Sequence, residues 1–183
     1  MAPKVLKQIE SLDRIARDFA QFARLPRRRA DEVDVGTLVR DVTDLYAGAE
    51  LEGITVRCEV GDPLPSVWWD EEELRRVLLN MVLNAKEALD GRASGHIMLR
   101  AASATHDSRL GVLVTIEDDG VGIEPADAER LFEPQFSTKT RGTGLGLAIV
   151  SRIVQDLGGT IDFESEPGAG TTFRLWWPSV DPR

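Results

Sequence analysis

The pattern of hydrophobic and polar residues divides this chain into helical and extended stretches. Apolar residues at spacings of three and four predict helices at residues 4–24, 35–52, 71–89, 125–131 and 145–157. Extended stretches between turn residues predict strands at residues 54–60, 95–104, 110–117, 160–165 and 170–177. This order predicts a mixed sheet with helices on one face, which is an α+β fold built as a two-layer α/β sandwich.

Residues at the helix ends support these bounds. Asp34 and Asp70 stand where an N-cap side chain can accept hydrogen bonds from the first free amides of a helix. Pro26 ends the first helix because it disfavours helical backbone at the preceding residue, and Gly158 with Gly159 stops the last one. The side chains expected to face the core are Leu38, Val42 and Leu45 in the second helix and Leu74, Val77, Leu78, Met81 and Leu83 in the third.

Composition and charge narrow the class of protein. A formal net charge of −9 at pH 7 argues against nucleic acid or an anionic membrane as the main partner. Cys58 is the single cysteine, so there is no disulfide framework, which fits a reducing compartment. No apolar run approaches ~20 residues, and the first residues lack a signal-peptide pattern. We therefore expect a cytoplasmic location, either for a soluble protein or for the cytoplasmic part of a membrane-bound one.

Four segments at element boundaries contain the candidate chemistry. Asn80 and Asn84 lie one turn apart on the third helix. Residues 118–123, Asp-Asp-Gly-Val-Gly-Ile, follow a strand, and residues 131–139, Leu-Phe-Glu-Pro-Gln-Phe-Ser-Thr-Lys, come next. Residues 142–147, Gly-Thr-Gly-Leu-Gly-Leu, open an apolar helix. In this order and spacing the segments resemble the N, G1, F and G2 boxes of the ATP-binding domain of sensor histidine kinases, within the GHKL superfamily. The resemblance covers residues 66–178.

The resemblance implies that the chain binds ATP and Mg²⁺. Mg²⁺ prefers hard oxygen ligands and keeps most of its water, so one side-chain carbonyl together with ATP phosphates can hold it. By resemblance Asn84 is that metal ligand, and Asn80, Asn84 and Lys139 form the catalytic set. The nucleotide-binding residues that the resemblance implies are Asn84, Glu87, Asp118, Gly120, Gly122, Ile123, Phe132, Thr138, Lys139, Arg141, Gly142, Thr143, Gly144, Leu145, Gly146, Leu147 and Thr171.

The base and the phosphates are expected to meet different parts of this set. By resemblance the Asp118 carboxylate accepts a hydrogen bond from the adenine amino group, and Thr171 belongs to a Gly-Thr pair that helps to hold adenine. Glycines beside Asp118 let the backbone pass close to the ring. At the phosphate end, bare amides and the helix dipole at the start of the helix after residue 144 attract anions.

Residues 134–143 look like the ATP lid of the family. The segment is polar, and Phe132 and Phe136 are expected to anchor it. Lys139 and Arg141 are the lid cations able to reach phosphates, although both also fit solvated loop charges. Considered without the other motifs, Asn84 on the third helix also fits an asparagine whose hydrogen bonds are made locally within a core. Glu87 fits a solvated helix charge as well as it fits a contact to metal-bound water.

Three other binding loops are excluded by their missing residues. Residues 118–123 lack the alternating acids and terminal Glu of a calcium loop. Residues 142–147 lack the Gly-Lys-Ser/Thr of a Walker loop. They also have Leu147 where a dinucleotide fingerprint has its last glycine, and they follow a polar segment rather than a strand.

Asn80 bears on the type of reaction. In the hydrolysing branch of the superfamily this position usually holds a Glu that activates water, whereas histidine kinases commonly have Asn. An amide cannot take a proton near pH 7. Asn80 therefore favours phosphoryl transfer to a protein over steady hydrolysis of ATP.

A phosphoacceptor histidine is missing from this pattern. The acceptor normally sits on a helix, followed by Glu or Asp and then, four residues further on, by Pro. His96 lies in an expected strand, and His106 is expected in a loop with Leu110 in place of the proline. Residues 18–26 resemble the end of the second helix of the dimerisation and phosphotransfer hairpin, most similar to nitrogen-regulation-type sensor kinases. An excised fragment and a naturally split kinase both fit.

The resemblance implies a catalytic domain that transfers the γ-phosphoryl group of ATP to a His on another helix or chain. The expected organisation is a partial hairpin helix at 1–26, a linker at 27–34 and the catalytic domain at 35–180. Expected partners are ATP, the phosphoacceptor helix, indirectly a response regulator, and a second copy through the N-terminal helix; nucleic acid is not expected. A GHKL-type ATPase and a nucleotide-gated regulatory binding module are the alternatives.

Overall fold

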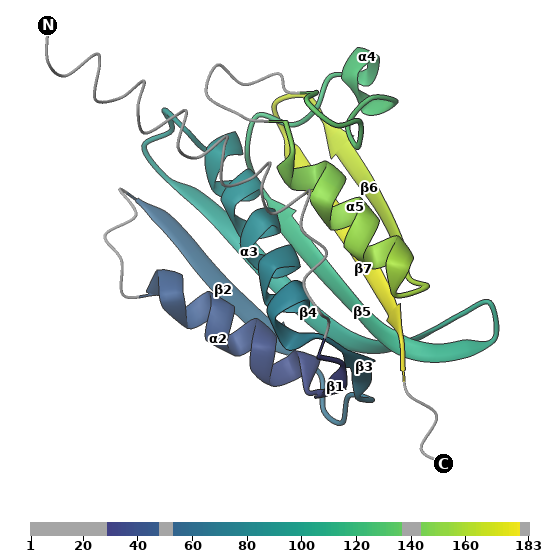
Figure 1. Ribbon diagram of the computed structural model, residues 1–183. Coiled ribbons are helices and arrows are strands. Elements are labelled where there is room, and N and C mark those ends of the chain that lie inside the picture. The colour runs from purple at the N-terminus through teal and green to yellow at the C-terminus, as the bar shows by residue number, and fades with distance from the viewer. Residues whose placement is uncertain (1–28, 48–52, 137–143, 180–183) are drawn as a thin grey trace, which may run out of the picture.

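The computed structural model describes residues 29–47, 53–136 and 144–179 (Figure 1). Its elements are β1 (Asp31–Val33), α2 (Val35–Ala47), β2 (Ile54–Val60), β3 (Val67–Trp69), α3 (Glu71–Ala88), β4 (Gly95–His106), β5 (Arg109–Asp118), α4 (Pro125–Ala128), α5 (Gly146–Asp156), β6 (Thr160–Glu166) and β7 (Gly170–Pro178). The helix expected at 4–24, and the end of the helix expected at 35–52, lie outside the described residues.

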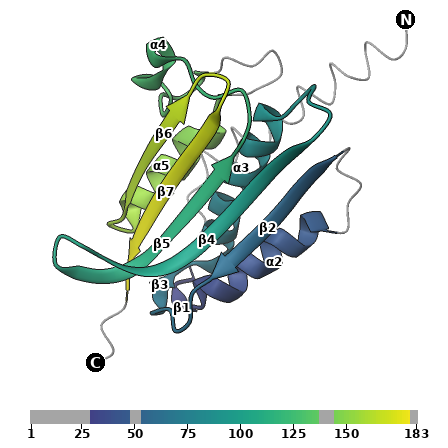
Figure 2. The same ribbon diagram turned by 180° about the vertical axis from the view of Figure 1, so that it is seen from behind.

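The fold is a five-stranded mixed sheet with its helices on one face, as the sequence predicts. The strand order is β2-β4-β5-β7-β6. The β2 and β4 strands are parallel, and the remaining neighbours are antiparallel. Figure 1 shows α2, α3 and α5 lying across the near face of the sheet, and Figure 2 shows the opposite face uncovered by helices. This arrangement confirms the predicted two-layer α+β fold.

The uncovered face of the sheet is polar, which explains how it tolerates water. Arg100 on β4 donates to Glu59 on β2 (3.1 Å) and to Glu117 on β5 (2.6 Å). Arg174 on β7 pairs with Asp162 and Glu164 on β6 in the same way. Exposed ion pairs of this kind contribute little stability. Their effect is to keep this face solvated, so that the inner face alone builds the core.

The two predicted helix caps are confirmed. Asp70 accepts hydrogen bonds from the amides of Glu72 and Glu73 and begins α3. Asp34 accepts from the amide of Thr37 at 3.0 Å and from its hydroxyl at 2.9 Å, and begins α2. These bonds lower the pKa of Asp34 below its ordinary value, with the backbone bond from Thr37 the largest cause. Each cap typically stabilises its helix by about 1 kcal/mol.

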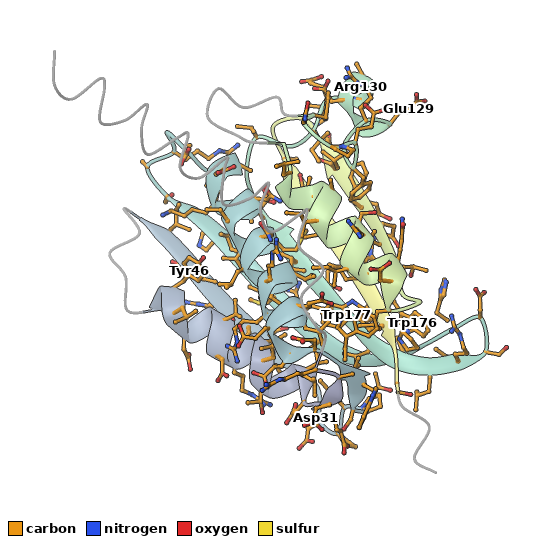
Figure 3. The ribbon with its side chains drawn as sticks, viewed as in Figure 1. Asp31, Tyr46, Glu129, Arg130, Trp176 and Trp177 are labelled. Atoms are coloured by element: carbon orange, nitrogen blue, oxygen red, sulfur yellow. The ribbon has the colours of Figure 1, made fainter. Side chains whose placement is uncertain are left out.

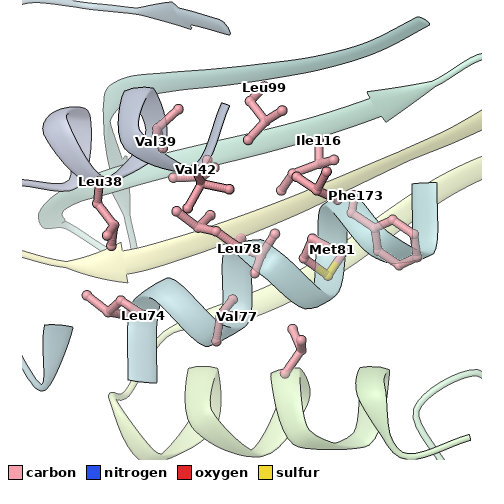
Figure 4. Close-up of a cluster of buried hydrophobic side chains, with 14 of the residues drawn as sticks. Leu38, Val39, Val42, Leu74, Val77, Leu78, Met81, Leu99, Ile116 and Phe173 are labelled. Carbon is pink, nitrogen blue, oxygen red and sulfur yellow. The ribbon is translucent and has the colours of Figure 1, made fainter. Parts of the chain in front are cut away.

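The core lies between the helices and the inner face of the sheet (Figure 4). On α3, the side chains of Leu74, Val77 and Leu78 are 0% exposed, and they belong to the same buried cluster as Leu99 on β4 and Ile116 on β5. Burying one such side chain contributes about 1.5–3 kcal/mol. The buried side of α3 therefore fixes the rotation of the helix about its axis. This rotation in turn fixes the direction in which its polar residues Asn80 and Asn84 point.

Two leucines that were expected in the core are exposed, so those predictions were wrong. Leu83 on α3 is 43% exposed and Leu45 on α2 is 62% exposed. Leu83 follows Leu74 by nine positions, which at about 100° per residue places it half a turn away from the core side. Leu45 lies at the edge of the buried stripe of α2, a helix that packs mainly against β2 at the edge of the sheet.

The long β4–β5 hairpin corrects the placement of His106, which ends strand β4 instead of lying in a loop. Asp107 and Ser108 both have positive φ, at 47° and 61°, and make a two-residue turn. The strands consequently run up to the turn, and His106 pairs with Arg109. The His106 ring lies 5.1 Å from that of Trp176, which is 3% exposed although it belongs to the outer face. Figure 3 labels Trp176 together with Trp177, the next residue of β7, which belongs to the buried core.

Three further details differ from the sequence prediction. The expected helix at 125–131 is only α4, which ends at Ala128. The sequence analysis did not predict β1 or β3, which pair antiparallel and form a separate two-stranded sheet. Both strands are only three residues long, too short for a periodic signal.

Among the residues that the structure describes, no helix combines the length and apolar character needed to cross a membrane.

Candidate functional site

The start of α5 packs against the two asparagines of α3. A Cβ atom placed on Gly146 would stand 3.3 Å from Asn80 Oδ1 and 4.0 Å from Asn84 Nδ2. Asn80 Nδ2 donates to the carbonyl of Arg76 at 2.9 Å, which orients its oxygen toward α5. The glycine at the first helical position therefore lets the free amides of α5 come close to both side-chain amides.

The contact between the start of α5 and the two asparagines combines backbone amides, which bind anions, with an amide oxygen, which can bind a cation. The N-cap of α5, Leu145, makes no side-chain capping bond, so its own side chain does not occupy the first amides of the helix, which are the groups that attract anions. The amide oxygen of Asn84 is a hard ligand of the type that Mg²⁺ accepts. Among the described residues, no group of three His, Cys, Asp or Glu side chains is placed to hold a metal.

Asp118 stands at the end of β5 and is buried, with 5% of its surface exposed. Its Oδ1 accepts a hydrogen bond from the amide of Gly120 at 2.9 Å. A Cβ on Gly120 would lie 2.6 Å from that oxygen and 2.7 Å from Ala88 Cβ at the end of α3. Only glycine therefore lets the loop fold back onto both Asp118 and α3.

The loop after Asp118 is also fixed to the β6–β7 turn. Gly122 has φ of 72°, and a Cβ there would lie 2.2 Å from the carbonyl oxygen of Glu166. The amide of Gly168 donates to the carbonyl of Val121 at 2.7 Å. Because α3 and the β6–β7 turn hold the loop from opposite sides, the backbone at residues 119–122 has a defined path beside the buried carboxylate.

Thr171 lies directly beside Asp118 in the sheet. The two residues are register partners on β7 and β5, and each is 5% exposed. Ser165, the register partner of Thr171 on β6, joins them through contacts of its hydroxyl with Ile123, Gly170 and Thr171. Ser165 was missed by the sequence analysis, although it takes the inward position that Ile161 and Phe163 take earlier in β6. A polar residue at that position was the available signal.

Arg92, which the sequence analysis did not single out, connects two backbone segments, the loop after Asp118 and the β6–β7 turn. Its guanidinium donates to the carbonyls of Asp119, Gly120 and Gly168. Residues 90–94 have no periodic pattern, so nothing in the sequence indicated the role of Arg92. The side chain joins the loop after Asp118 to the β6–β7 turn.

Asp119 is held by His96 on β4. The amide of His96 donates to Asp119 Oδ1 at 2.7 Å, and the ring Nδ1 lies 3.0 Å from Oδ2. Burial opposes ionisation of Asp119, but the hydrogen bonds and charge of His96 outweigh it and lower the pKa of this carboxyl. His96 therefore lies in strand β4 and has a structural role, because it holds the carboxylate of Asp119.

We expect Arg92→Ala to weaken nucleotide binding by about three- to tenfold, because several charge-assisted bonds to the loop beside Asp118 are lost. Hydrogen exchange at residues 119–122 should become faster. Calorimetry with ADP and exchange mass spectrometry measure the two effects. Arg57→Ala, on the uncovered face of β2, is the matched control and should change neither. Unchanged affinity and exchange in Arg92→Ala would contradict this role.

The ends of the expected lid lie against one another. The amide of Gln135 donates to the carbonyl of Gly144 at 3.0 Å, and Gly144 has φ of 66°. Phe132 packs edge-on against Phe163 at 6.0 Å, and Arg130 lies 4.5 Å over the ring of Phe136. The predicted lid residues Thr138, Lys139, Arg141, Gly142 and Thr143 lie outside the described residues.

The elements that contain the expected site residues of the described part of the chain meet at one end of the molecule. Figure 1 shows the end of α3, the start of α5 and the β6–β7 turn at this end. Asn80, Asn84 and Glu87 come from α3, and Asp118 to Ile123 follow β5. Leu145 is buried and Leu147 half-buried, and both side chains pack in or against the core.

A protein family and several known proteins are similar to this chain in sequence. Residues 69–181 match the family described as histidine kinase-, DNA gyrase B-, and HSP90-like ATPase. Sensor histidine kinase ZraS of Escherichia coli (strain K12) is 35% identical over 179 residues, covering 97% of this chain and 37% of ZraS. Nitrogen regulation protein NtrY of Azorhizobium caulinodans is 30% identical over 185 residues, covering 98% of this chain and 23% of NtrY.

A solved structure extends the similarity to three dimensions. The crystal structure of full-length ShkA in complex with AMPPNP matches with a TM-score of 0.73 at 31% sequence identity. The match covers 97% of this chain and 36% of the ShkA chain. This chain thus spans 37% of ZraS and 23% of NtrY, well under half the length of the relatives that it resembles.

Proposed function

We propose a function for this chain, which belongs to the histidine kinase-, DNA gyrase B-, and HSP90-like ATPase family and is a catalytic domain of the histidine kinase type. The domain binds ATP with Mg²⁺ and transfers the γ-phosphoryl group to a histidine on another helix or chain. The observation that supports this most directly is that the start of α5 packs against Asn80 and Asn84 on α3, and that the end of α3 contacts the loop after Asp118, the register partner of Thr171.

In this proposal the base and the phosphates occupy different parts of the site. Asp118 accepts from the amino group of adenine, and residues 119–122 pass beside the ring. The first amides of α5 bind phosphate oxygens, and Lys139 and Arg141 of the lid add positive charge. Asn84 holds Mg²⁺, which neutralises charge on the phosphates. Positioning and neutralisation are most of what phosphoryl transfer requires of a protein.

Asn80 favours transfer over hydrolysis. Its amide donates to the carbonyl of Arg76, and an amide cannot accept a proton from an attacking water near pH 7. Among the described residues, both histidines lie in β4: His96 contacts Asp119, and His106 contacts Trp176. Neither is on a helix, so we propose that the acceptor is supplied by another segment or chain.

We further propose the domain organisation and partners. Residues 1–26 form part of a dimerisation and phosphotransfer hairpin, residues 27–34 the linker, and residues 35–180 the catalytic domain. The pairing of β1 with β3 attaches the end of this linker to the catalytic domain. The N-terminal helix joins two copies, a response regulator receives the phosphoryl group from the acceptor, and the domain works in the cytoplasm.

Transfer of labelled phosphate tests this function. With γ-labelled ATP and Mg²⁺, we expect no label on the chain alone and an acid-labile, base-stable label on an added phosphoacceptor hairpin. Rapid multiple-turnover release of phosphate without an acceptor would instead indicate an ATPase. Nucleotide binding without transfer to any supplied hairpin would indicate a regulatory binding module. Robust acid-labile labelling of the chain alone, lost in His96→Gln or His106→Gln, would place the acceptor within this chain.

We expect Asn84→Ala to weaken binding of ATP with Mg²⁺ by about tenfold or more and to leave the affinity for adenosine within about twofold, because the side chain acts through metal and phosphates. Titration calorimetry with both ligands measures the difference. Leu83→Ala, one residue earlier on the exposed side of α3, is the control and should bind both ligands as the wild type does. An equal loss for adenosine and ATP would contradict the metal role.

A further inference from the structure

Ser165 makes three polar contacts that together use all of its hydrogen-bonding capacity. Its Oγ accepts from the amide of Ile123 at 2.8 Å and donates to the carbonyl of Gly170 at 2.9 Å. Its third contact is with Thr171 Oγ1, also at 2.9 Å, where either hydroxyl could donate. A serine hydroxyl has one proton and two acceptor positions. Three partners therefore saturate it.

The chemistry of these partners fixes the direction of the contact with Thr171. The carbonyl of Gly170 can only accept, so it takes the single proton of Ser165. The amide of Ile123 can only donate, so it occupies one acceptor position. The remaining position on Ser165 must accept, and Thr171 must donate to it. Because the proton of Thr171 is directed at Ser165, the rest of Thr171 Oγ1 can only accept.

Thr171 is adjacent to the carboxylate that we assign to the base. The Thr171 and Asp118 side chains share the inward face of neighbouring strands at one register position. One Asp118 oxygen accepts from the amide of Gly120, and an ionised carboxylate donates nothing. The amino group of a base at this position would meet hydrogen-bond acceptors from both side chains, and its two protons could serve both.

We infer that Ser165 is a specificity-determining positioning residue, which orients the Thr171 hydroxyl so that the site selects 6-aminopurine over 6-oxopurine nucleotides. This inference rests on the proposed nucleotide function. Asp118 alone discriminates incompletely, because the N1–H of a 6-oxopurine can also donate to a carboxylate after a small shift. A freely rotating hydroxyl beside it could then donate to O6. Ser165 prevents that rotation.

The test compares ADP with IDP, which differ at position 6, by calorimetry with Mg²⁺. We expect the wild type to prefer ADP, and Ser165→Ala to reduce the ratio of the IDP Kd to the ADP Kd by about tenfold. Ser165→Thr keeps the hydroxyl and should keep the wild-type ratio. Thr172→Ala, on the opposite face of β7, is the matched control and should keep it as well.

A double variant separates proton direction from general damage. Adding Thr171→Val to Ser165→Ala removes the rotating donor, so the preference for ADP should rise again by about fivefold. If Ser165→Ala does not fold, Ser165→Cys, a near-isosteric and weaker donor, should lower the ratio in the same direction. A wild-type ratio in the variant that folds would overturn the inference. A wild type that binds neither nucleotide would instead overturn the proposed function, and this inference with it.

Discussion

Asp118→Ala should reduce the affinity for ATP and ADP by about 10- to 150-fold, which corresponds to roughly 1.5–3 kcal/mol. The carboxylate is buried at the end of β5, and its neighbour Gly120 already donates to one of its oxygens. A base that loses this acceptor leaves one proton of its amino group unpaired in a buried site, so the loss includes the desolvation of that group as well as the bond. Titration calorimetry with Mg²⁺ present measures the change.

Two variants show whether the effect arises from the carboxylate itself. Asp118→Asn keeps the shape and the oxygen that accepts from Gly120, but it presents an amide donor to the base, and it should lose nearly as much affinity as Asp118→Ala. Glu117→Ala removes the preceding carboxylate, which points to the uncovered face and pairs with Arg100. That variant should bind nucleotide normally. Wild-type affinity in Asp118→Asn would rule out our assignment of the base.

The sequence predicts those parts of the fold and site that depend on local spacing. Asn80 and Asn84 are four positions apart, so they share a flank of α3 wherever that helix packs. Asp70 and Asp34 cap their helices through amides two or three residues away, a contact fully determined by the local chain. The glycines after Asp118 mark a loop with restricted side-chain space. For these residues the relevant contacts lie within a few positions along the chain, so the local sequence determines nearly all of their geometry.

The remaining features depend on contacts between distant segments. Arg92 meets carbonyls at residues 119, 120 and 168, so its role depends on the sheet order that brings two loops together. Ser165 reaches Ile123, 42 positions away in the chain. The exposure of Leu83 follows from which side of α3 the sheet covers, and apolar character alone does not reveal that side. Local patterns do not predict contacts of this kind.

Gly170→Ala should destabilise the domain by about 3 kcal/mol or more and lower its Tm by roughly 6–12 °C. Gly170 has φ of 121°, a region that side chains rarely adopt. A Cβ there would lie 2.0 Å from the carbonyl oxygen of Asp118 and 3.0 Å from Asp119 Cα. Both are backbone atoms, so no change of rotamer relieves the overlap. β5 and β7 must separate at Asp118 and Thr171, and nucleotide affinity should fall with stability.

Gly168→Ala separates the overlap from the backbone strain. Gly168 also has positive φ, at 82°, but a Cβ there meets nothing within 4 Å. Its expected loss is therefore limited to the strain, about 1 kcal/mol, or a shift in Tm of roughly 2–4 °C. Thermal unfolding by circular dichroism compares the variants, and calorimetry with ADP follows binding. Equal shifts in Tm would mean that strain alone makes glycine necessary at position 170. A stable Gly170→Ala protein with normal affinity would show that the alignment of Asp118 with Thr171 tolerates separation of the strands.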